Sequence, residues 1–218
     1  NRILIVQTAF IGDVILATPI IEKLSAFYPD AKIDFLLRKG NENLLENHPK
    51  INKVLIWTKG SKKYRSLFQV VNLVRSRNYD CVINVQRFLA AGIITALSGA
   101  KVRVGFTKNP MSFLFNKKIR HKLIGQHETS RNLSLVRELT DDKYVRPKLY
   151  PSKADFEKVK ELQKSRYLCF APTSVWATKQ FPSLKWVELI LSQDDNWTIY
   201  LLGGPADVEE CDELVRMC

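Results

Sequence analysis

The first residues equipped for chemistry lie in the segment QTAFIGD, residues 7–13, which follows a short apolar run. The carboxylate of Asp13 can accept a proton from a hydroxyl group, as a general base does. An aspartate at the start of a helix equally serves to accept backbone N–H groups and to interact with the helix dipole, which lowers its basicity. Gly12, just before it, lets a ligand approach the backbone closely. The residues alone leave both roles of Asp13 open.

A second set of polar residues follows the apolar run DCVINVQ, residues 80–86. Gln86 ends this run and can hydrogen-bond a ligand, or only water. A basic cluster without acids comes later in the chain. It suits the phosphates or carboxylates of an anionic ligand, although a solvated loop explains it equally well. The cluster consists of Arg103, Lys117, Lys118, Arg120 and Lys122, with His121 adjacent.

The last third of the chain carries a further set of candidate ligand contacts. Trp176 offers a ring for stacking on a ligand, or simply packs in a loop. Lys179 brings a positive charge just before a predicted helix. A helix N-terminus also favours an anion, although an ordinary exposed loop lysine is the simpler interpretation. Its glycine pair fits a strand-end turn or a close approach to a ligand. The candidates are Thr173, Ser174, Trp176, Lys179, Gly203 and Gly204.

Short apolar runs alternate with helical periodicity along the first 139 residues, and this succession predicts a doubly wound parallel sheet. Strands are expected at residues 2–7, 32–37, 53–57, 80–86 and 102–105. Helices are expected at residues 13–27, 40–47, 64–77, 88–97 and 127–139, with a basic loop at residues 106–122. Ligands bind at the carboxyl ends of the strands in such a sheet, so Asp13 and Gln86 are expected at the ligand-binding edge.

Residues 141–151 contain two aspartates, Pro147 and Pro151 and few apolar residues, as expected of an interdomain linker. It divides the chain into residues 1–150 and 151–218. The second part is predicted to hold strands at residues 167–171 and 197–202 and helices at residues 154–164, 184–191 and 207–217. Two strands are too few for a doubly wound sheet. We therefore expect an incomplete second Rossmann-like domain, cut at Cys218.

The 218 residues carry a net charge of +12, which is unevenly distributed. Residues 1–150 hold 26 basic and 11 acidic side chains, whereas residues 151–218 hold 8 and 11. The positive part attracts an anionic partner, such as nucleic acid, an anionic membrane surface or a phosphorylated substrate, unless it is simply a soluble basic surface. Because 45% of the residues are apolar, the chain is not expected to be disordered.

Several classes of protein are disfavoured by what the sequence lacks. No apolar run reaches the roughly 18–20 residues of a membrane span. The dinucleotide motif GxGxxG and the P-loop motif GxxxxGK[ST] are both absent, which argues against a Rossmann dehydrogenase or a P-loop kinase. The cysteines show no metal-site spacing, so we expect reduced thiols, no zinc and a cytosolic location. They are Cys81, Cys169, Cys211 and Cys218.

A family resemblance extends over nearly the whole chain. The segments that carry it are RILIVQTAFIGDVILATPIIEKLSAFYPDAKIDFL, YDCVINVQ, AKVRVGF, HETSRNLSLVREL, APTSVWATKQFPSLKWVELI and IYLLGG. In this order they resemble the heptosyltransferase-like glycosyltransferases of family 9, the ADP-heptose:lipopolysaccharide heptosyltransferases. The opening GD block together with the (A/P)-x-(S/T)…K-x-(W/F)-P block is fairly specific. His127 and Arg131 match a family motif at a helix start and are interpreted as mainly structural.

The resemblance implies a two-lobed GT-B fold and an inverting, metal-independent transfer of a sugar. The donor would typically be ADP-heptose, bound by the C-terminal lobe, and the acceptor an anionic saccharide of the lipopolysaccharide core, bound by the N-terminal lobe. No further cofactor is expected. The resemblance implies that Asp13 is the base on the acceptor hydroxyl and that Lys179 contacts the donor diphosphate. The other expected donor contacts are Thr173, Ser174, Trp176, Gly203 and Gly204, and the expected acceptor contacts are Gly12, Gln86, Arg87, Arg103, Arg120 and Lys122.

Two features depart from the family pattern. Arg87 stands where the family has a glycine, which alters the acceptor cleft or adds a phosphate contact. The later Asp-(S/T)-Gly-x-x-His phosphate loop has no counterpart before Cys218. Two alternatives therefore stay open: a non-catalytic acceptor-lobe fragment, and a basic nucleic-acid-binding protein, although no RRM, KH or helix-turn-helix signature is present. The leading hypothesis remains a bacterial, cytoplasmic glycosyltransferase with peripheral contact to the inner membrane and no nucleic-acid partner.

Overall fold

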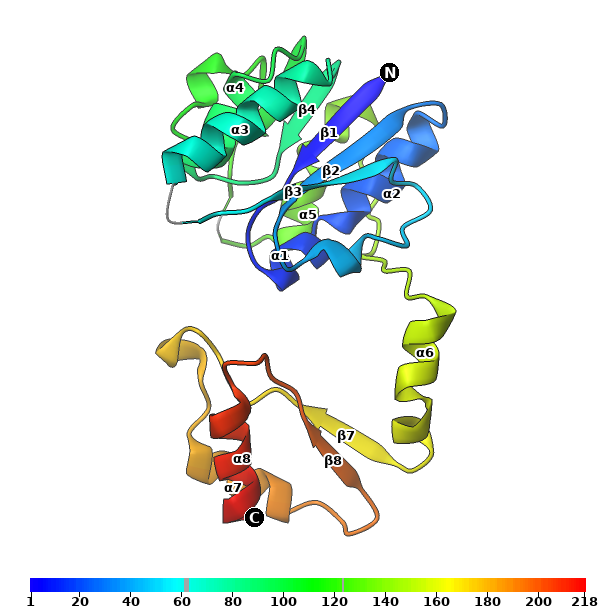
Figure 1. The fold of residues 1–218 in the computed structure, drawn as a ribbon, viewed down its shortest axis with the longest axis vertical. Helices are drawn as coiled ribbons and strands as arrows, with labels where there is room; N and C mark the ends of the chain where they lie inside the picture. The colour runs from blue at the N-terminus through cyan, green and yellow to red at the C-terminus, as the bar shows by residue number, and fades with distance from the viewer. Residues whose placement is uncertain (61–62, 123) are drawn as a thin grey trace. The chain divides into compact units, whose positions relative to one another are not determined.

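The computed structural model describes residues 1–60, 63–122 and 124–218, which form two compact units, Asn1–Pro151 and Ser152–Cys218 (Figure 1). The first unit is built around six parallel strands in the order β3-β2-β1-β4-β5-β6. This order confirms the predicted doubly wound parallel sheet. The strands are β1 (Arg2–Val6), β2 (Lys32–Arg38), β3 (Lys53–Trp57), β4 (Cys81–Asn84), β5 (Val102–Phe106) and β6 (Lys117–Ile119).

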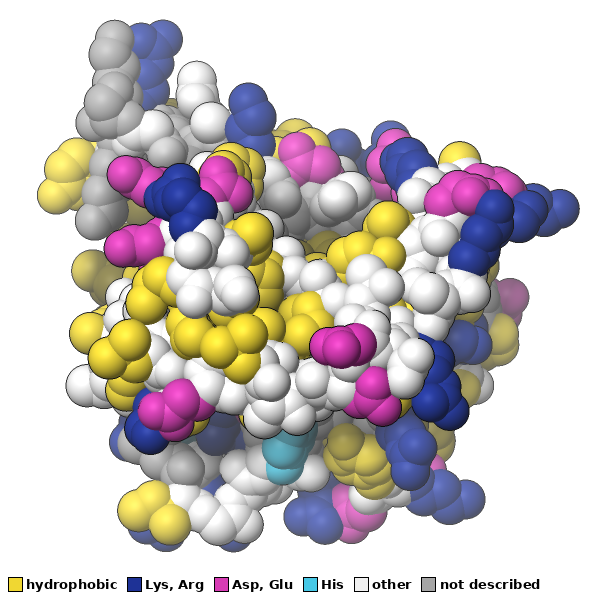
Figure 2. All heavy atoms as spheres, turned by 90° about the horizontal axis from the view of Figure 1, so that it is seen from below, with side chains coloured by type: hydrophobic (Ala, Val, Ile, Leu, Met, Phe, Trp, Pro, Cys, Tyr) yellow, Lys and Arg dark blue, Asp and Glu magenta, His cyan; other side chains and the backbone are white. Residues whose placement is uncertain are grey.

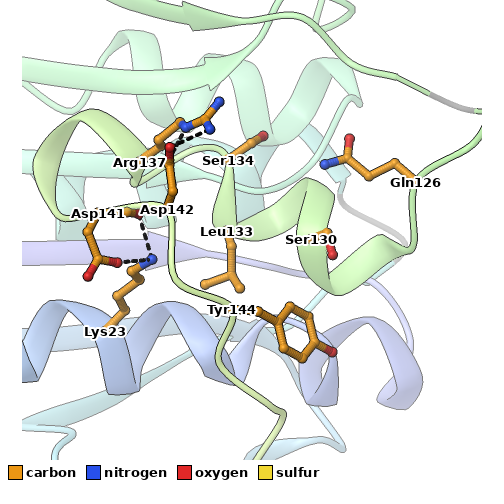
Figure 3. Close-up of a pocket in the computed structure, with 9 residues that line it drawn as sticks. All are labelled: Lys23, Gln126, Ser130, Leu133, Ser134, Arg137, Asp141, Asp142 and Tyr144. Carbon is orange, nitrogen blue, oxygen red and sulfur yellow. Dashed lines mark hydrogen bonds and ion pairs between the residues drawn. The ribbon is translucent and has the colours of Figure 1, made fainter.

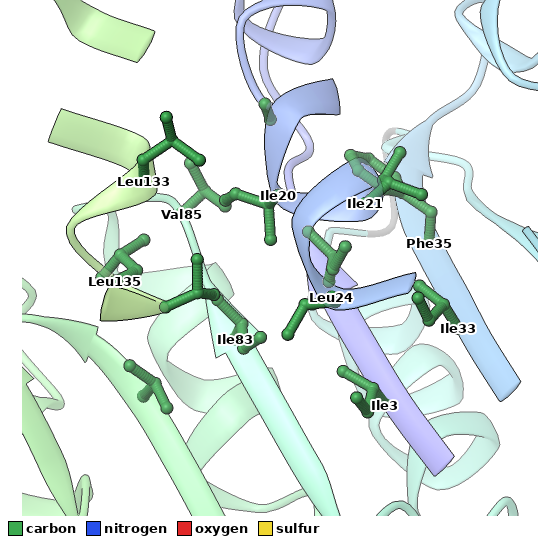
Figure 4. Close-up of a cluster of buried hydrophobic side chains, with 14 of the residues drawn as sticks. Ile3, Ile20, Ile21, Leu24, Ile33, Phe35, Ile83, Val85, Leu133 and Leu135 are labelled. Atoms are coloured by element: carbon green, nitrogen blue, oxygen red, sulfur yellow. The ribbon is translucent and has the colours of Figure 1, made fainter. Parts of the chain in front are cut away.

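Helices cover both faces of this sheet because alternate side chains of each strand point to opposite faces. Ile3 and Ile5 of β1 pack in one core cluster with α2 (Thr18–Phe27) and with residues at the end of α5 (Glu128–Leu133). Figure 4 shows Ile3 in this cluster with Leu24 of α2 and Leu133 of α5. Leu4 and Val6 pack in the other cluster, against α3 (Lys63–Ser76) and α4 (Leu89–Ala96). Burial of each such side chain contributes about 1.5–3 kcal/mol, so these two layers hold the unit together.

The helix predicted over residues 13–27 is interrupted, and the prediction of one continuous helix is wrong. It divides into α1 (Ile11–Ile15) and α2, with Pro19 in the first turn of α2. Proline has no N–H to donate to the carbonyl group of Ile15, four residues earlier. The hydroxyl of Thr18 donates to that carbonyl instead, at 2.8 Å, so the break leaves no orphaned acceptor.

Three other predicted elements also differ from the structure. Residues 40–47 form only one 3₁₀ turn, η1 (Glu42–Leu44), where the Glu42 carboxylate accepts the backbone N–H of Gly40. The predicted helix 127–139 divides into α5 and η3 (Arg137–Leu139), because tighter turns at residues 132–136 bring Leu135 and Val136 into the core. The predicted basic loop contains η2 (Ser112–Leu114) and the edge strand β6, which tolerates lysines because one of its edges is unpaired.

The segment predicted as a linker, residues 141–151, is attached to the first unit by side chains from α2. The ammonium group of the buried Lys23 donates to the carbonyl oxygens of Asp141 and Lys143 at 2.6 and 2.7 Å. Thr18 accepts the backbone N–H of Lys148, and the Tyr150 hydroxyl donates to Glu22. Most of this segment is therefore part of the first unit.

The second unit has one parallel pair of strands, β7 (Tyr167–Phe170) and β8 (Thr198–Leu201). Ser152 caps its first helix by accepting the N–H of Asp155 at 3.1 Å, and the Asp155 carboxylate accepts the Ser152 N–H in return. Many apolar side chains of this unit are exposed, and Figure 2 shows a face on which hydrophobic side chains gather. The helical elements are α6 (Lys153–Lys160), η4 (Glu161–Gln163), η5 (Ala177–Lys179), α7 (Ser183–Leu191) and α8 (Val208–Met217).

In the part of the chain that the structure describes, every helix is too short or too polar to cross a lipid bilayer.

Candidate active site

The order of the strands fixes where a ligand binds in the first unit. The chain adds β2 on one side of β1 and β4 on the other, so the connections diverge between β1 and β4. Val6 pairs with Asn84, and the loops after these two strands therefore begin side by side. An open sheet binds its ligands in the crevice at such a switch point, outside the carboxyl ends of the strands.

A cavity of about 250 Å³ lies at this switch point. Its walls come from the loop after β1 with the start of α1, from the loop after β4, and from the segment that follows β6. The side chains combine two carboxylates, three basic groups, two carboxamides and apolar surface. They belong to Gln7, Ala9, Phe10, Asp13, Val85, Gln86, Arg87, Phe88, His121, Glu128 and Arg131.

Asp13 occupies the third position of α1 and is half-buried in the wall of this cavity. Its Oδ2 accepts the backbone N–H of Phe10 at 3.0 Å, as expected of an acid in the first turn of a helix. No described residue donates to Oδ1. The helix-capping role and a proton-accepting role are therefore compatible, because each uses a different oxygen.

The loop after β1 is held in place around this carboxylate. The side-chain amide of Asn41 donates to the carbonyl oxygen of Ala9 at 3.1 Å, and the ammonium group of Lys59 donates to that of Thr8 at 2.9 Å. The hydrogen bond from Phe10 to Asp13 and the two hydrogen bonds to the loop carbonyls fix the backbone before any ligand binds. Such a preformed loop keeps a reacting group in one geometry.

Gln86 is almost fully buried in the facing wall. Its Oε1 accepts the hydroxyl proton of Thr8 at 2.8 Å, which leaves the side-chain NH₂ group to donate to a ligand. The amide of Asn109 holds the loop from outside by donating to the carbonyl oxygens of Gln86 and Phe88, each at 3.0 Å. This arrangement requires Gly92 in α4, because a Cβ there would lie 2.1 Å from the Asn109 oxygen.

The cavity that contains the Asp13 and Glu128 carboxylates is also lined by Arg87, Arg131 and His121. Arg87 is exposed, with its guanidinium 5.6 Å from the centroid of the Phe88 ring. Arg131 pairs with Glu128 at 3.1 Å and also donates to the carbonyl oxygen of Lys122. The cavity can therefore accept an anionic ligand, because Glu128 is already neutralised by Arg131.

The imidazole of His121 completes the basic side of the cavity. Its ring packs edge-on against Phe106, with centroids 4.7 Å apart, and its buried Nδ1 has no hydrogen-bond partner among the described residues. Burial lowers the pKa of His121, and the positive charges of Arg131 and Arg87 lower it further. The ring is therefore neutral near pH 7 and offers hydrogen bonds rather than charge.

The predicted acceptor-binding residues are only partly brought together. Gln86 and Arg87 line the cavity with Asp13, whereas Arg120 and Lys122 are exposed beside it and do not. Arg103 is used inside the first unit, where its guanidinium donates to the carbonyl oxygens of Ala100 and Leu114.

Gly12 lies in α1, where a Cβ would meet no atom within 4 Å. The fold of the first unit therefore does not itself require a glycine at this position.

The cavity also contains functional side chains that the sequence did not single out. His121 appeared there only as a neighbour of basic residues, Arg131 as a structural residue, and Glu128 not at all. Strand β6 determines where these residues lie, because it is parallel to its neighbour and the chain leaves it at the same edge of the sheet. A sequence analysis that does not recognise β6 predicts a solvated loop here.

The predicted donor-binding residues lie on two neighbouring loops of the second unit. Thr173 and Ser174 follow β7, and Gly203 and Gly204 follow β8. Because β7 and β8 are adjacent and parallel, both loops leave the same edge of the strand pair.

In the first of these loops, the Ser174 hydroxyl accepts the backbone N–H of Trp176 at 3.2 Å. The side chains of Trp176 and Lys179 are exposed.

The fold itself accounts for one glycine of the pair in the second unit. A Cβ on Gly203 would lie 2.9 Å from the Cβ of Asp207, which is closer than two carbons normally approach. The backbone N–H of Gly204 donates to the Asp207 carboxylate at 2.6 Å. This turn positions the start of α8. Packing explains Gly203 without a ligand, whereas a Cβ on Gly204 would meet the Asp207 carboxylate only at 3.4 Å, so the fold does not itself require the second glycine.

A second cavity, of about 170 Å³, lies between α2 and a segment that includes α5 and the residues after it (Figure 3). Its charged groups are already paired: Lys23 with Asp141, and Arg137 with Asp142. Its lining shares no residue with the cavity that contains Asp13, and its polar groups hold residues 141–143 in place. We assign it a structural role.

Comparison with known proteins identifies relatives over nearly the whole chain. The family model of glycosyltransferase family 9 (heptosyltransferase) matches residues 67–218. Lipopolysaccharide heptosyltransferase 3 of Escherichia coli K12 is 28% identical, over 95% of this chain and 65% of that protein. The chain spans less than two thirds of the length of this relative.

Solved structures show the same fold. A family 9 glycosyl transferase from Veillonella parvula superposes with a TM-score of 0.86 at 18% identity, covering 99% of this chain and 66% of that one. An Escherichia coli heptosyltransferase determined with ADP superposes with a TM-score of 0.72 at 24% identity, covering 99% and 71%. These similarities confirm the predicted GT-B-type fold class.

Proposed function

The chain belongs to glycosyltransferase family 9, the heptosyltransferases, and on that premise we propose that it transfers heptose from ADP-heptose to an anionic saccharide of the lipopolysaccharide core. The proposal rests on the family match, on relatives that are lipopolysaccharide heptosyltransferases, and on a structural neighbour determined with ADP. The observation that carries it is the cavity at the switch point, where a carboxylate oxygen without a hydrogen-bond donor among the described residues meets basic and amide groups.

In this proposal the acceptor binds in the first unit, residues 1–150. Oδ1 of Asp13 takes the proton from the acceptor hydroxyl as that oxygen forms its bond to the anomeric carbon. The bond from this carbon to the donor diphosphate breaks in the same step, so the configuration at the carbon is inverted. Arg87 and the NH₂ group of Gln86 bind the anionic sugar, and the cations around them attract it to the cavity.

The donor binds to residues 151–218 in this proposal. Lys179 and the hydroxyl groups of Thr173 and Ser174 contact the diphosphate, and Trp176 stacks on the base or the sugar. The positive charge of Lys179 stabilises the leaving diphosphate, and the transfer then requires no metal ion. We place the protein in the bacterial cytoplasm, in peripheral contact with the inner membrane that displays the acceptor, and without a nucleic-acid partner.

Replacement of Asp13 by asparagine tests the base directly. Asp13→Asn retains an oxygen that can accept the Phe10 N–H, so α1 stays capped while the basic oxygen is lost. We expect kcat to fall by about 10²–10⁴-fold in a transfer assay with ADP-heptose, the range for loss of a general base. Glu128→Gln is the matched control, because it alters the other carboxylate of the cavity and should reduce kcat far less.

Calorimetry with ADP separates the two parts of the proposal. Asp13→Asn should bind ADP as the unmodified protein does, whereas Lys179→Gln should bind it more weakly, because a charged contact to the diphosphate is lost. Full transfer activity in Asp13→Asn would rule out the assignment of the base. Unchanged ADP affinity in Lys179→Gln would rule out the donor contact.

A further inference from the structure

Helix α4 lies at the surface, yet its sequence is apolar on every side. The chain contains no charged residue between Arg87 and Lys101. Ala91 and Ile94 of the helix are buried against the sheet, whereas Leu89 and Leu97 are about half exposed. A helix that is hydrophobic all round is normally covered on all sides. The outward side of α4 is therefore a surface suited to a partner.

Helix α3 extends this surface. Tyr64 and Phe68, one turn apart, are 85% and 66% exposed. They line a groove of about 230 Å³ that also includes Ile93 of α4 and Leu97, the residue after that helix. We call this the α3–α4 surface. It consists of Tyr64, Leu67, Phe68, Leu89, Ile93 and Leu97. Contiguous exposed apolar side chains of this kind mark interaction sites on soluble domains.

The charged side chains described on α3 and at the start of α4 are basic. Arg65 and Arg75 are exposed on α3, where Arg75 lines the groove, and Arg87 is exposed just before α4. Between residues 47 and 127 the sequence has a single acid, Asp80, whose carboxylate accepts the backbone N–H of Arg2. An apolar centre with a cationic margin is complementary to an anionic lipid surface, where acyl chains take the apolar side chains and headgroups take the cations.

The α3–α4 surface is continuous with the candidate active site. A largely apolar cavity of about 410 Å³ lies beside the start of α4, lined in part by Trp57, Leu89 and Ala90. This cavity shares Gln86 and Phe88 with the cavity that contains Asp13. The apolar cavity beside α4 therefore adjoins the cavity that contains Asp13.

We propose that the α3–α4 surface docks on an anionic lipid bilayer, with Tyr64 and Phe68 inserted at the level of the headgroups. The helices lie on the membrane, since the eight residues of α4 fall far short of the roughly 20 that span one. This inference extends the proposed function, because it locates the membrane contact through which a lipid-linked acceptor reaches the cavity. The bilayer is favoured over a protein partner because the exposed charges that α3 and the start of α4 bring to this surface, those of Arg65, Arg75 and Arg87, are all positive.

Flotation with lipid vesicles tests the docking. The protein should float with vesicles of phosphatidylcholine and phosphatidylglycerol in equal parts, and should not float with phosphatidylcholine alone or in high salt. The double variant Tyr64→Ser/Phe68→Ser should lose about tenfold or more in vesicle affinity, because its apolar contacts with the membrane are removed. Phe113→Ser is the matched control, since Phe113 is equally exposed but lies outside the α3–α4 surface.

Both substituted side chains point to solvent, so the double variant should fold and should transfer sugar normally to a soluble, delipidated acceptor. Equal vesicle binding by the double variant and the unmodified protein would overturn the docking. So would concentration-dependent dimerisation that the double variant abolishes, because the surface would then bind a second copy. Loss of transfer in Asp13→Asn is independent of these outcomes, so the docking and the proposed function fail separately.

Discussion

Strand β1 of the first unit and strand β7 of the second are both short apolar runs in parallel pairing, yet their surroundings differ. Leu4, Ile5 and Val6 of β1 are fully buried between two layers of helices, whereas Tyr167 and Cys169 of β7 are exposed. The same local pattern therefore forms a strand in both places. What the pattern does not determine is burial, which depends on the helices that cover each face.

The difference predicts where the stability of the protein resides. All buried hydrophobic side chains of the described residues lie in the first unit, apart from Leu214 in α8. The first unit should therefore unfold cooperatively and late, whereas amides of the second unit should exchange with solvent more readily. Hydrogen exchange resolved by segment measures the two units separately, and the following substitutions test the comparison in order of expected effect.

The largest effect is expected for Phe35→Ala in β2. Phe35 is fully buried among side chains from both sheet and helices, so its removal should destabilise the first unit by about 3–5 kcal/mol. Denaturant unfolding followed by the buried Trp57 measures this loss. Phe156→Ala in the exposed face of α6 is the control and should change stability by no more than about 0.5 kcal/mol. If Phe35→Ala and Phe156→Ala lowered the free energy of unfolding equally, the assignment of most of the stability to the first unit would be wrong.

A smaller effect is expected for Thr18→Val, which keeps the shape of a fully buried side chain but removes its hydroxyl. The carbonyl oxygen of Ile15 and the backbone N–H of Lys148 would each lose a partner. The expected cost is about 1–3 kcal/mol, the range for buried polar groups left unsatisfied. Amide hydrogen exchange should become faster at residues 141–151 and remain unchanged in α7 and α8, since both hydrogen-bond partners of the Thr18 hydroxyl lie in the first unit.

The smallest effect concerns pH, because all three histidines lie in the first unit. Burial lowers the pKa of His48, although Glu22 at 3.4 Å raises it in part. The folded state therefore binds fewer protons than the unfolded state below the ordinary histidine pKa of about 6.5. The contribution of the neutral His48 ring to the free energy of unfolding is complete above pH 6.5. It is lost as the pH falls from there towards the lowered pKa of the folded state.

Chemical denaturation between pH 7 and pH 5 should thus show a weakening first unit and a second unit that changes little. His48→Asn keeps an acceptor for the backbone N–H of Lys50 and should flatten this dependence. A decline of the same slope in the His48→Asn variant would show that other groups cause it.

The parts of the fold that the sequence predicted are those where one pattern dominates. The apolar run before residue 7 and the glycine-aspartate pair after it were enough to place Asp13 at the edge where ligands bind. Strand β6 was missed because two of its three residues are lysines, and with it the positions of His121 and Arg131. Its pairing with β5 depends on an edge that only the assembled sheet provides.

The break at Pro19 shows the opposite limit. The apolar periodicity continues through it, because α1 and α2 both bury residues in the same core cluster. Hydrophobic spacing reports which side of the chain faces the core, and it does not report whether each backbone carbonyl has a partner. Pro19 in the sequence indicated the break, and the hydroxyl of Thr18 satisfies the carbonyl group that the break would leave without a hydrogen bond.

The clamp formed by Lys23, Thr18 and Glu22 has a mechanical consequence for the chain between the two units. Residues 141–150 are anchored to α2, and Ser152 is engaged in the capping box of α6, so side-chain hydrogen bonds hold the backbone on either side of Pro151. The ring of Pro151 fixes its own φ angle. The chain is thus locally restrained here and does not behave as a free linker.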